Sequence, residues 1–269
     1  YYLQGRVEKI KASICVFLIA TLSLVCYSQS LSNDQFQTEP IYSYTILAEY
    51  PHDTSAFTQG LVYHDGYIYE GTGLYGASTV RRVRLDDGQI LQLLALPEQY
   101  FGEGITIVDD KIIQLTWQQN TGFVYDRETF ALIDQFTYPT EGWGLTYDGT
   151  YLIMSDGSSI LTYLEPLTFQ PVKKLEVKSN TGPVRYLNEL EYIDGVIYAN
   201  IWLTDTIVLI APENGRVIAW IDFSNLRKHL QADPQDIDVL NGIAYKPDTD
   251  ELLVTGKLWP TIFGVRLLK

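Results

Sequence analysis

A short pattern recurs five times along this 269-residue chain, and this repeat restricts the possible folds more than any other feature of the sequence. Each copy begins with a polar or aromatic residue, usually followed by glycine, and continues as an alternating apolar strand. Successive copies are 44, 40, 45 and 53 residues apart, which is the length of one blade of a β-propeller. The copies begin at Gln59, Glu103, Trp143, Asn188 and Asn241.

Every copy predicts a unit of four antiparallel strands, because a turn rich in Asp and Gly and further candidate strands follow it. The fifth copy reaches Lys269 with only three strands, whereas Ser43–Glu49 alternates like a strand and precedes the first copy. Placed outermost in the last unit, this segment would close the ring and cover a sheet edge. The sequence therefore predicts an all-β fold, a five-bladed β-propeller closed by an N-terminal strand, over residues 41–269. A β-sandwich with coincidental spacing is the alternative, and the insertion Asn225–Asp238 is expected to be a surface excursion or a lid.

The N-terminal residues have the layout of a secretory signal peptide. Three basic residues between Arg6 and Lys11 precede an apolar run from about Ala12 to Val25, which is short for a membrane span. We therefore predict a signal peptide over 1–28 and a linker over 29–40. The mature protein would be secreted or periplasmic, without stable membrane contact. An uncleaved membrane anchor is the alternative.

Cysteine usage and charge narrow the chemistry of the remaining domain. Both cysteines, Cys15 and Cys26, lie within the predicted signal peptide, so the domain would have no disulfide, thiolate nucleophile or Cys-based metal site. Lipidation of Cys26 is a weaker alternative. Removing the 3 basic and 1 acidic residues of 1–28 leaves 16 basic and 32 acidic residues, a net charge of −16. This charge disfavours binding to nucleic acid and favours a cationic partner such as a peptide N-terminus.

A ligand site is predicted at one mouth of the central channel. In a propeller, the start of each first strand and the end of each second strand lie on the same face. The first group consists of the five residues that begin the repeats. The second group is Glu70, Trp117, Asp156, Trp202 and Lys257. Carboxylates, amides, indoles and a lysine in an otherwise apolar pattern are typical of an aromatic pocket for a small polar ligand.

Six segments, in order along the chain, carry a family resemblance. They are Phe57–Leu61, Tyr69–Gly76, Gln114–Trp117, Glu141–Leu145, Leu187–Glu191 and Val254–Trp259. The chain from about Tyr42 to Leu268 resembles the glutaminyl cyclases (glutamine cyclotransferases) of plants and bacteria. This resemblance implies a glutaminyl-peptide cyclotransferase that converts N-terminal glutamine to pyroglutamate, releases ammonia, and needs no metal or other cofactor. Its partners would be peptides or proteins with an N-terminal glutamine, and we expect a monomer.

The resemblance also implies roles for eight residues. Glu70 would be the catalytic acid/base, and Lys257 would be the second catalytic residue. One departure from the family pattern is Ile68, where the family often has phenylalanine. The residues implied in substrate binding are Phe57, Gln59, Trp117, Trp143, Asn188 and Trp202.

These residue types suit an intramolecular cyclisation. The α-amine of glutamine attacks its own γ-carboxamide carbon, so the enzyme must hold the side chain folded back, which a cage of indoles would do. The indoles would also attract the ammonium group. A carboxylate would move the proton, and amide donors or a lysine would stabilise charge on the γ-oxygen.

Other interpretations remain open at this point. Each proposed site residue has a structural alternative, such as a core aromatic or a solvated strand-end carboxylate. A propeller that binds a peptide or saccharide without catalysis is the main functional alternative. A hydrolase is disfavoured because Ser155 and Ser158 have no apparent histidine partner. His52, His64 and His229 are expected on the surface, outside the site, which also argues against a zinc centre.

Overall fold

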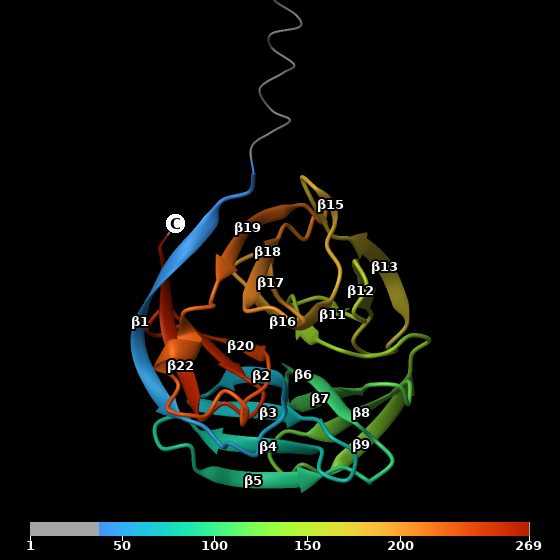
Figure 1. The fold of residues 1–269 in the computed structure, drawn as a ribbon. Helices are drawn as coiled ribbons and strands as arrows, with labels where there is room; N and C mark the ends of the chain where they lie inside the picture. The colour runs from blue at the N-terminus through green and yellow to red at the C-terminus, as the bar shows by residue number, and fades with distance from the viewer. Residues whose placement is uncertain (1–37, 269) are drawn as a thin grey trace, which may run out of the picture. The chain divides into compact units, whose positions relative to one another are not determined.

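We describe the fold from a computed structural model of the chain, in which residues 38–268 are described (Figure 1). The predicted signal peptide 1–28 and most of the predicted linker 29–40 lie outside these residues. Within the described range, the regular structure is β-strand apart from one short 3-10 helix, η1 (Leu226–His229). The prediction of an all-β fold is confirmed. No helix among residues 38–268 is long and apolar enough to span a membrane.

Three of the sheets contain four antiparallel strands each, taken in chain order. Their strand orders are β2-β3-β4-β5, β6-β7-β8-β9 and β10-β11-β12-β13. The strands are β2 (Thr58–His64), β3 (Tyr67–Thr72), β4 (Thr79–Arg84), β5 (Ile90–Ala95), β6 (Gly102–Val108), β7 (Lys111–Thr116), β8 (Thr121–Asp126), β9 (Leu132–Thr137), β10 (Leu145–Tyr147), β11 (Leu152–Met154), β12 (Ile160–Leu164) and β13 (Pro171–Glu176).

The remaining long strands form one eight-stranded sheet in the order β16-β17-β18-β19-β1-β22-β21-β20. A short hairpin, β14 and β15, precedes β16 in the chain. The strands are β1 (Ile41–Pro51), β14 (Lys178–Ser179), β15 (Gly182–Pro183), β16 (Leu187–Ile193), β17 (Val196–Ile201), β18 (Thr206–Ile210), β19 (Val217–Asp222), β20 (Leu240–Lys246), β21 (Glu251–Gly256) and β22 (Thr261–Leu268).

Strand β1 joins the two halves of this sheet. It pairs antiparallel with β22 from Ser43 to Pro51, and parallel with β19 at only two positions, Ile41 and Tyr42. The segment predicted as the closing strand, Ser43–Glu49, therefore lies outermost beside the last three strands, as expected. The N-terminal strand supplies the fourth strand that the fifth repeat lacks.

The first strands of the five repeats contact one another in a closed series. β2 contacts β6, β6 contacts β10, β10 contacts β16, β16 contacts β20, and β20 contacts β2. In Figure 1 the labelled strands β2, β6, β16 and β20 lie near the centre, whereas β5, β13 and β1 lie outside.

Glycine follows the first residue in four of the five repeats, and the close approach of the inner strands explains this at Gly60 and Gly104. A β-carbon added at Gly60 would lie 2.4 Å from the backbone nitrogen of Ile105, and one at Gly104 would lie 2.6 Å from the carbonyl oxygen of Trp143. No side chain fits at such distances.

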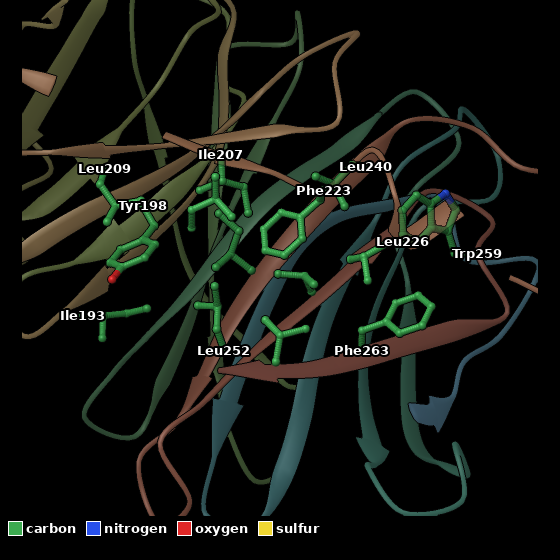
Figure 2. Close-up of a cluster of buried hydrophobic side chains, with 14 of the residues drawn as sticks. Ile193, Tyr198, Ile207, Leu209, Phe223, Leu226, Leu240, Leu252, Trp259 and Phe263 are labelled. Carbon is green, nitrogen blue, oxygen red and sulfur yellow. The ribbon is translucent and has the colours of Figure 1, made fainter. Parts of the chain in front are cut away.

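Apolar side chains fill the space between neighbouring sheets. Figure 2 shows the cluster between the two halves of the eight-stranded sheet, which includes the fully buried Phe223, Trp259 and Phe263. The rings of Trp259 and Phe263 meet edge to face, with centres 6.3 Å apart. The insertion after β19 is anchored in this cluster by Leu226 of η1, whose side chain is also fully buried. Most other residues of Asn225–Asp238 are exposed, which agrees with the expected surface excursion.

Candidate active site

A cavity of about 330 Å³ opens where the first strands begin and the second strands end. Seven of the eight predicted site residues line it. They are Phe57, Gln59, Trp117, Trp143, Asn188, Trp202 and Lys257. Four further residues complete the lining, and these are Phe101, Glu103, Leu203 and Asp238.

The antiparallel order of the strands explains why residues so far apart in sequence meet here. Gln59, at the start of β2, comes from one of the first strands. Trp117, Trp202 and Lys257 each follow directly after the last residue of β7, β17 and β21. Antiparallel neighbours bring the start of one strand and the end of the next to the same edge. The half-buried indoles line the cavity, so they are not core aromatics.

Glu70 is the predicted site residue that does not line the cavity. It lies within β3, opposite Leu61 and Arg81, and is 1% exposed. Its Oε1 atom accepts a hydrogen bond of 2.7 Å from the Thr58 hydroxyl. The catalytic role implied for Glu70 does not fit this position. The physical reason is the position of Glu70 along its strand. β3 continues for two residues beyond Glu70, whereas Trp117 follows the last residue of β7.

His52, expected at the surface, is buried beside Glu70, with its side chain only 3% exposed. Its Nε2 atom lies 2.9 Å from Oε1 of Glu70, and its Nδ1 atom lies 2.7 Å from the carbonyl oxygen of Trp259. A carbonyl oxygen and an ionised carboxylate both accept hydrogen bonds and cannot donate them. Nδ1 therefore carries a proton towards Trp259, and Nε2 carries one towards Glu70. Burial lowers the pKa of His52, but the charge and hydrogen bond of Glu70 outweigh burial and raise it above its ordinary value.

The carboxylate in the cavity belongs to Glu103, which begins the second repeat. Its side chain is buried, and its Oε1 atom accepts a hydrogen bond of 3.0 Å from Nε2 of Gln59. Burial raises the pKa of Glu103 well above its ordinary value, the positive charge of Lys257 opposes that rise, and Glu141 adds to it. The sequence placed Glu103 among the converging residues but did not assign it a catalytic role.

Lys257 supplies the cationic group of the cavity. Its Nζ atom lies 4.6 Å from the centre of the Phe57 ring, within the range of a cation–π contact. Burial lowers the pKa of Lys257, while the charges of Glu103 and Asp238 oppose this lowering. A buried carboxyl group and a buried amine therefore act on each other across one small cavity.

A single carboxylate orients two of the indoles. Oε2 of Glu141 accepts hydrogen bonds from Nε1 of Trp117 at 2.8 Å and from Nε1 of Trp143 at 2.9 Å. Burial raises the pKa of Glu141, but hydrogen bonds from Trp143, Gln118 and Trp117 outweigh it, so the pKa is lowered. Trp143 in turn meets Trp202 edge to face, with ring centres 5.4 Å apart. Glu141 was missed as a site residue, although it lies two residues before Trp143 in a segment that carries the family resemblance.

Asn188 brings an unused acceptor to the cavity. Its Oδ1 atom is buried, and it has no hydrogen-bond partner within the part of the chain that the structure describes. The hydroxyl of nearby Ser155 makes two hydrogen bonds: it accepts one from the Gly144 amide and donates one to the Asn188 carbonyl. Asp156, predicted among the converging residues, does not line the cavity and instead accepts hydrogen bonds from the amide and hydroxyl of Ser158. Neither Ser155 nor Ser158 lines the cavity.

Comparisons with known proteins agree on one family. A sequence profile described as glutamine cyclotransferase matches residues 18–267. The chain is 42% identical over 244 residues to a glutaminyl-peptide cyclotransferase of Arabidopsis thaliana, covering 90% of this chain and 76% of the relative. Among solved structures it resembles the glutaminyl cyclase of Myxococcus xanthus, with a TM-score of 0.79 and 39% identity over 85% of this chain and 98% of that one.

Proposed function

The chain belongs to the glutamine cyclotransferase family, and on that premise we propose that it is an enzyme that converts N-terminal glutamine to pyroglutamate and releases ammonia. The resemblance identified from six sequence segments is confirmed at the level of the family. The observation that carries the proposal is the cavity in which Glu103 and Lys257 act on each other between aromatic walls. A binding module would have no need of a buried carboxyl group and a buried amine together.

We propose that Glu103, rather than Glu70, moves the proton. The α-amine attacks the γ-carboxamide carbon, a carbon–nitrogen bond closes the five-membered ring, and the bond to the amide nitrogen breaks. Glu103 accepts a proton from the α-amine and donates it to the departing nitrogen, which leaves as ammonia. A carboxyl group whose pKa is raised well above its ordinary value suits both halves of this transfer.

Lys257 and the cavity walls supply the other two requirements of the reaction. The ammonium group of Lys257 stabilises the negative charge that develops on the γ-oxygen as the amine attacks. The indoles of Trp117, Trp143 and Trp202 hold the glutamine side chain in its compact conformation. The free Oδ1 atom of Asn188 accepts a hydrogen bond from the substrate's α-nitrogen.

We also propose that the fold is a five-bladed β-propeller over residues 41–269, closed by β1. Two observations support this count: the five sequence repeats and the closed series of contacts among β2, β6, β10, β16 and β20. For the reaction itself we propose independence from metal ions. In support, residues 38–268 contain no group of three or more His, Cys, Asp or Glu side chains placed to hold a metal ion.

The mature protein is proposed to be an exported monomer that acts on peptides or proteins with N-terminal glutamine. The support for export is the layout of residues 1–28 alone. Sequencing the N-terminus of the protein recovered from the cell exterior or periplasm tests the cleavage, and light scattering tests the monomer.

The decisive experiment measures ammonia release from a glutamine-initiated dipeptide by purified protein in excess chelator. We expect activity in the wild type and a loss of about 10²-fold or more in Glu103→Gln. Glu98→Gln, which changes an exposed carboxylate, is the matched control and should retain activity. Folded wild-type protein without activity would overturn the proposed function, and activity lost to the chelator would overturn metal independence. Activity in the Glu103→Gln variant would mean that another residue moves the proton.

A further inference from the structure

A chain of hydrogen bonds leads from the backbone to the Glu103 carboxylate through two amide side chains. Nδ2 of Asn241 donates to the carbonyl oxygen of Thr58 at 3.0 Å and to Oε1 of Gln59 at 3.1 Å. Nε2 of Gln59 donates to Oε1 of Glu103 at 3.0 Å. Asn241 is fully buried in β20 and does not line the cavity.

The Thr58 carbonyl fixes which groups donate and which accept in this series of hydrogen bonds. The Thr58 carbonyl can only accept, so the NH₂ group of Asn241 must face it, and the same NH₂ group faces Gln59. Gln59 therefore presents its oxygen to Asn241 and its NH₂ group to Glu103. If the Gln59 amide turned over, two NH₂ groups would face each other at Asn241 and two acceptors at an ionised Glu103.

From this geometry, and resting on the proposed function, we infer that Asn241 is a positioning residue that locks the Gln59 amide so that it always donates to the catalytic carboxylate. Asn241 touches neither the substrate nor Glu103. It acts through Gln59, which lines the cavity.

The fixed orientation of the Gln59 amide favours one protonation state of Glu103. A protonated carboxyl group could donate to Gln59 only if the amide turned its oxygen towards Glu103, and Asn241 prevents this turn. Asn241 therefore stabilises the ionised form. The titratable groups that interact with Glu103 are Lys257, Glu141 and Tyr138. Within residues 38–268, Asn241 makes no hydrogen bond to any of these three side chains, so its effect on Glu103 is separable from theirs.

The test is a double-mutant cycle between Asn241→Leu and Gln59→Met, both of which nearly preserve side-chain volume. The readout is the pH profile of kcat/KM for a glutamine-initiated dipeptide. We expect Asn241→Leu to lower kcat/KM by about tenfold near neutral pH and to move the acidic limb to higher pH. In the Gln59→Met background, Asn241→Leu should cause no further shift of that limb. Additive shifts, or an unmoved limb in Asn241→Leu, would overturn the inference.

Asn200→Leu is the matched control, because it removes another fully buried amide from an inner strand. Oδ1 of Asn200 accepts from the Gly242 amide and does not contact Gln59. We expect this variant to lose stability without moving the acidic limb, whereas an equal shift would mean that any buried amide loss has this effect. If Asn241→Leu does not fold, Asn241→Ser replaces it, since a serine hydroxyl is too short to reach Gln59.

A second readout separates failure of this inference from failure of the proposed function. The ionisation of Glu103 can be followed by ¹³C NMR of protein labelled in its glutamate carboxyl carbons, with Glu103→Gln identifying the signal. We expect Asn241→Leu to raise the pKa of Glu103 whether or not the protein cyclises glutamine. An unchanged titration of Glu103 would overturn the positioning role of Asn241, even if the enzyme is active. A wild type that makes no pyroglutamate would overturn only the proposed function.

Discussion

His52 and Glu70 form a buried ion pair in which Nε2 lies 2.9 Å from Oε1, with side chains 3% and 1% exposed. Glu70 belongs to β3 in the first sheet, whereas the other ring nitrogen of His52 binds the Trp259 carbonyl between β21 and β22. The pair therefore connects the first repeat to the last. Thr58 connects the pair to the cavity, because its hydroxyl binds Glu70 and its neighbours, Phe57 and Gln59, line the cavity.

Removing one partner of this pair should cost stability more than catalysis. Glu70→Gln leaves His52 buried beside a neutral group, and losses of about 3 kcal/mol in the free energy of unfolding are typical of such changes. We expect that loss in urea unfolding, together with substantial activity at temperatures where the variant is folded. Glu128→Gln, which removes an exposed partner of Arg82, should change neither. A stable but inactive Glu70→Gln would restore the catalytic role to Glu70.

The ion pair also gives stability a defined pH dependence. The pKa of His52 is raised above its ordinary 6.5, so the contribution of His52 is complete below pH 6.5 and is lost as pH rises through the raised value. The pKa of Glu70 is lowered because its burial is outweighed by His52, Arg81 and Thr58. Its contribution is complete above its ordinary 4.5 and is lost as pH falls through the lowered value.

The stability difference between the wild type and Glu70→Gln should therefore be greatest between about pH 4.5 and 6.5. Urea unfolding of both proteins across pH 3 to 9, roughly the range that covers both titrations, measures this difference. A difference that grows steadily above pH 6.5 would contradict an imidazolium at His52.

Much of the fold could be predicted from sequence because each repeat has a local signature. Asp-Gly turns such as Asp65-Gly66 and Asp194-Gly195 adopt positive φ between paired strands, and the glycine at Gly104 marks the close approach of inner strands. These requirements act within a few residues, so a single sequence displays them. Ser43–Glu49 was placed correctly because an incomplete last repeat needs a partner strand.

The site was predicted less completely because its details depend on register and on contacts between distant residues. Glu70 and Trp117 were both predicted to lie at the end of a second strand. In the structure, Glu70 lies inside its strand and Trp117 follows the end of its strand. The burial of His52 depends on the Trp259 carbonyl, 207 residues away, for which the sequence carries no signal. Glu103 was recognised as converging, but only the cavity distinguishes it from Glu70.

Activity should depend on pH through both groups of the cavity. The pKa of Glu103 is well above its ordinary 4.5 and the pKa of Lys257 is below its ordinary 10.5. With an ionised Glu103 and a cationic Lys257 required, kcat/KM should rise through the first pKa and fall through the second. Lys257→Met removes the charge that opposes the effect of burial on Glu103, so the acidic limb of its residual activity should move to higher pH. A limb that stays in place for the same dipeptide would mean that the two groups do not interact.

Glu141 should control how well the substrate is held. One of its oxygens binds the indole nitrogens of both Trp117 and Trp143, so Glu141→Ala frees both rings to rotate. We expect KM for a glutamine-initiated dipeptide to rise by about tenfold or more, with a smaller effect on kcat, because the rings bind rather than move protons. Glu141→Gln keeps an acceptor oxygen and should show a weaker effect. Steady-state kinetics that show a fall in kcat alone would contradict this role.

The close approach of the inner strands predicts a strong effect of a single methyl group at Gly144. A β-carbon there would lie 2.0 Å from the backbone carbonyl oxygen of Asn188, a residue that lines the cavity. Backbone atoms cannot rotate away as a side chain would, so Gly144→Ala must separate β10 from β16, at a cost of about 3 kcal/mol in the free energy of unfolding. The same movement displaces Asn188 and should raise KM.

Gly149→Ala provides the comparison, because its β-carbon would meet open space and only its positive φ of 90° is unfavourable, costing about 1 kcal/mol. Equal losses for the two variants in urea unfolding would mean that the glycine at Gly144 serves the backbone conformation and not the contact between strands.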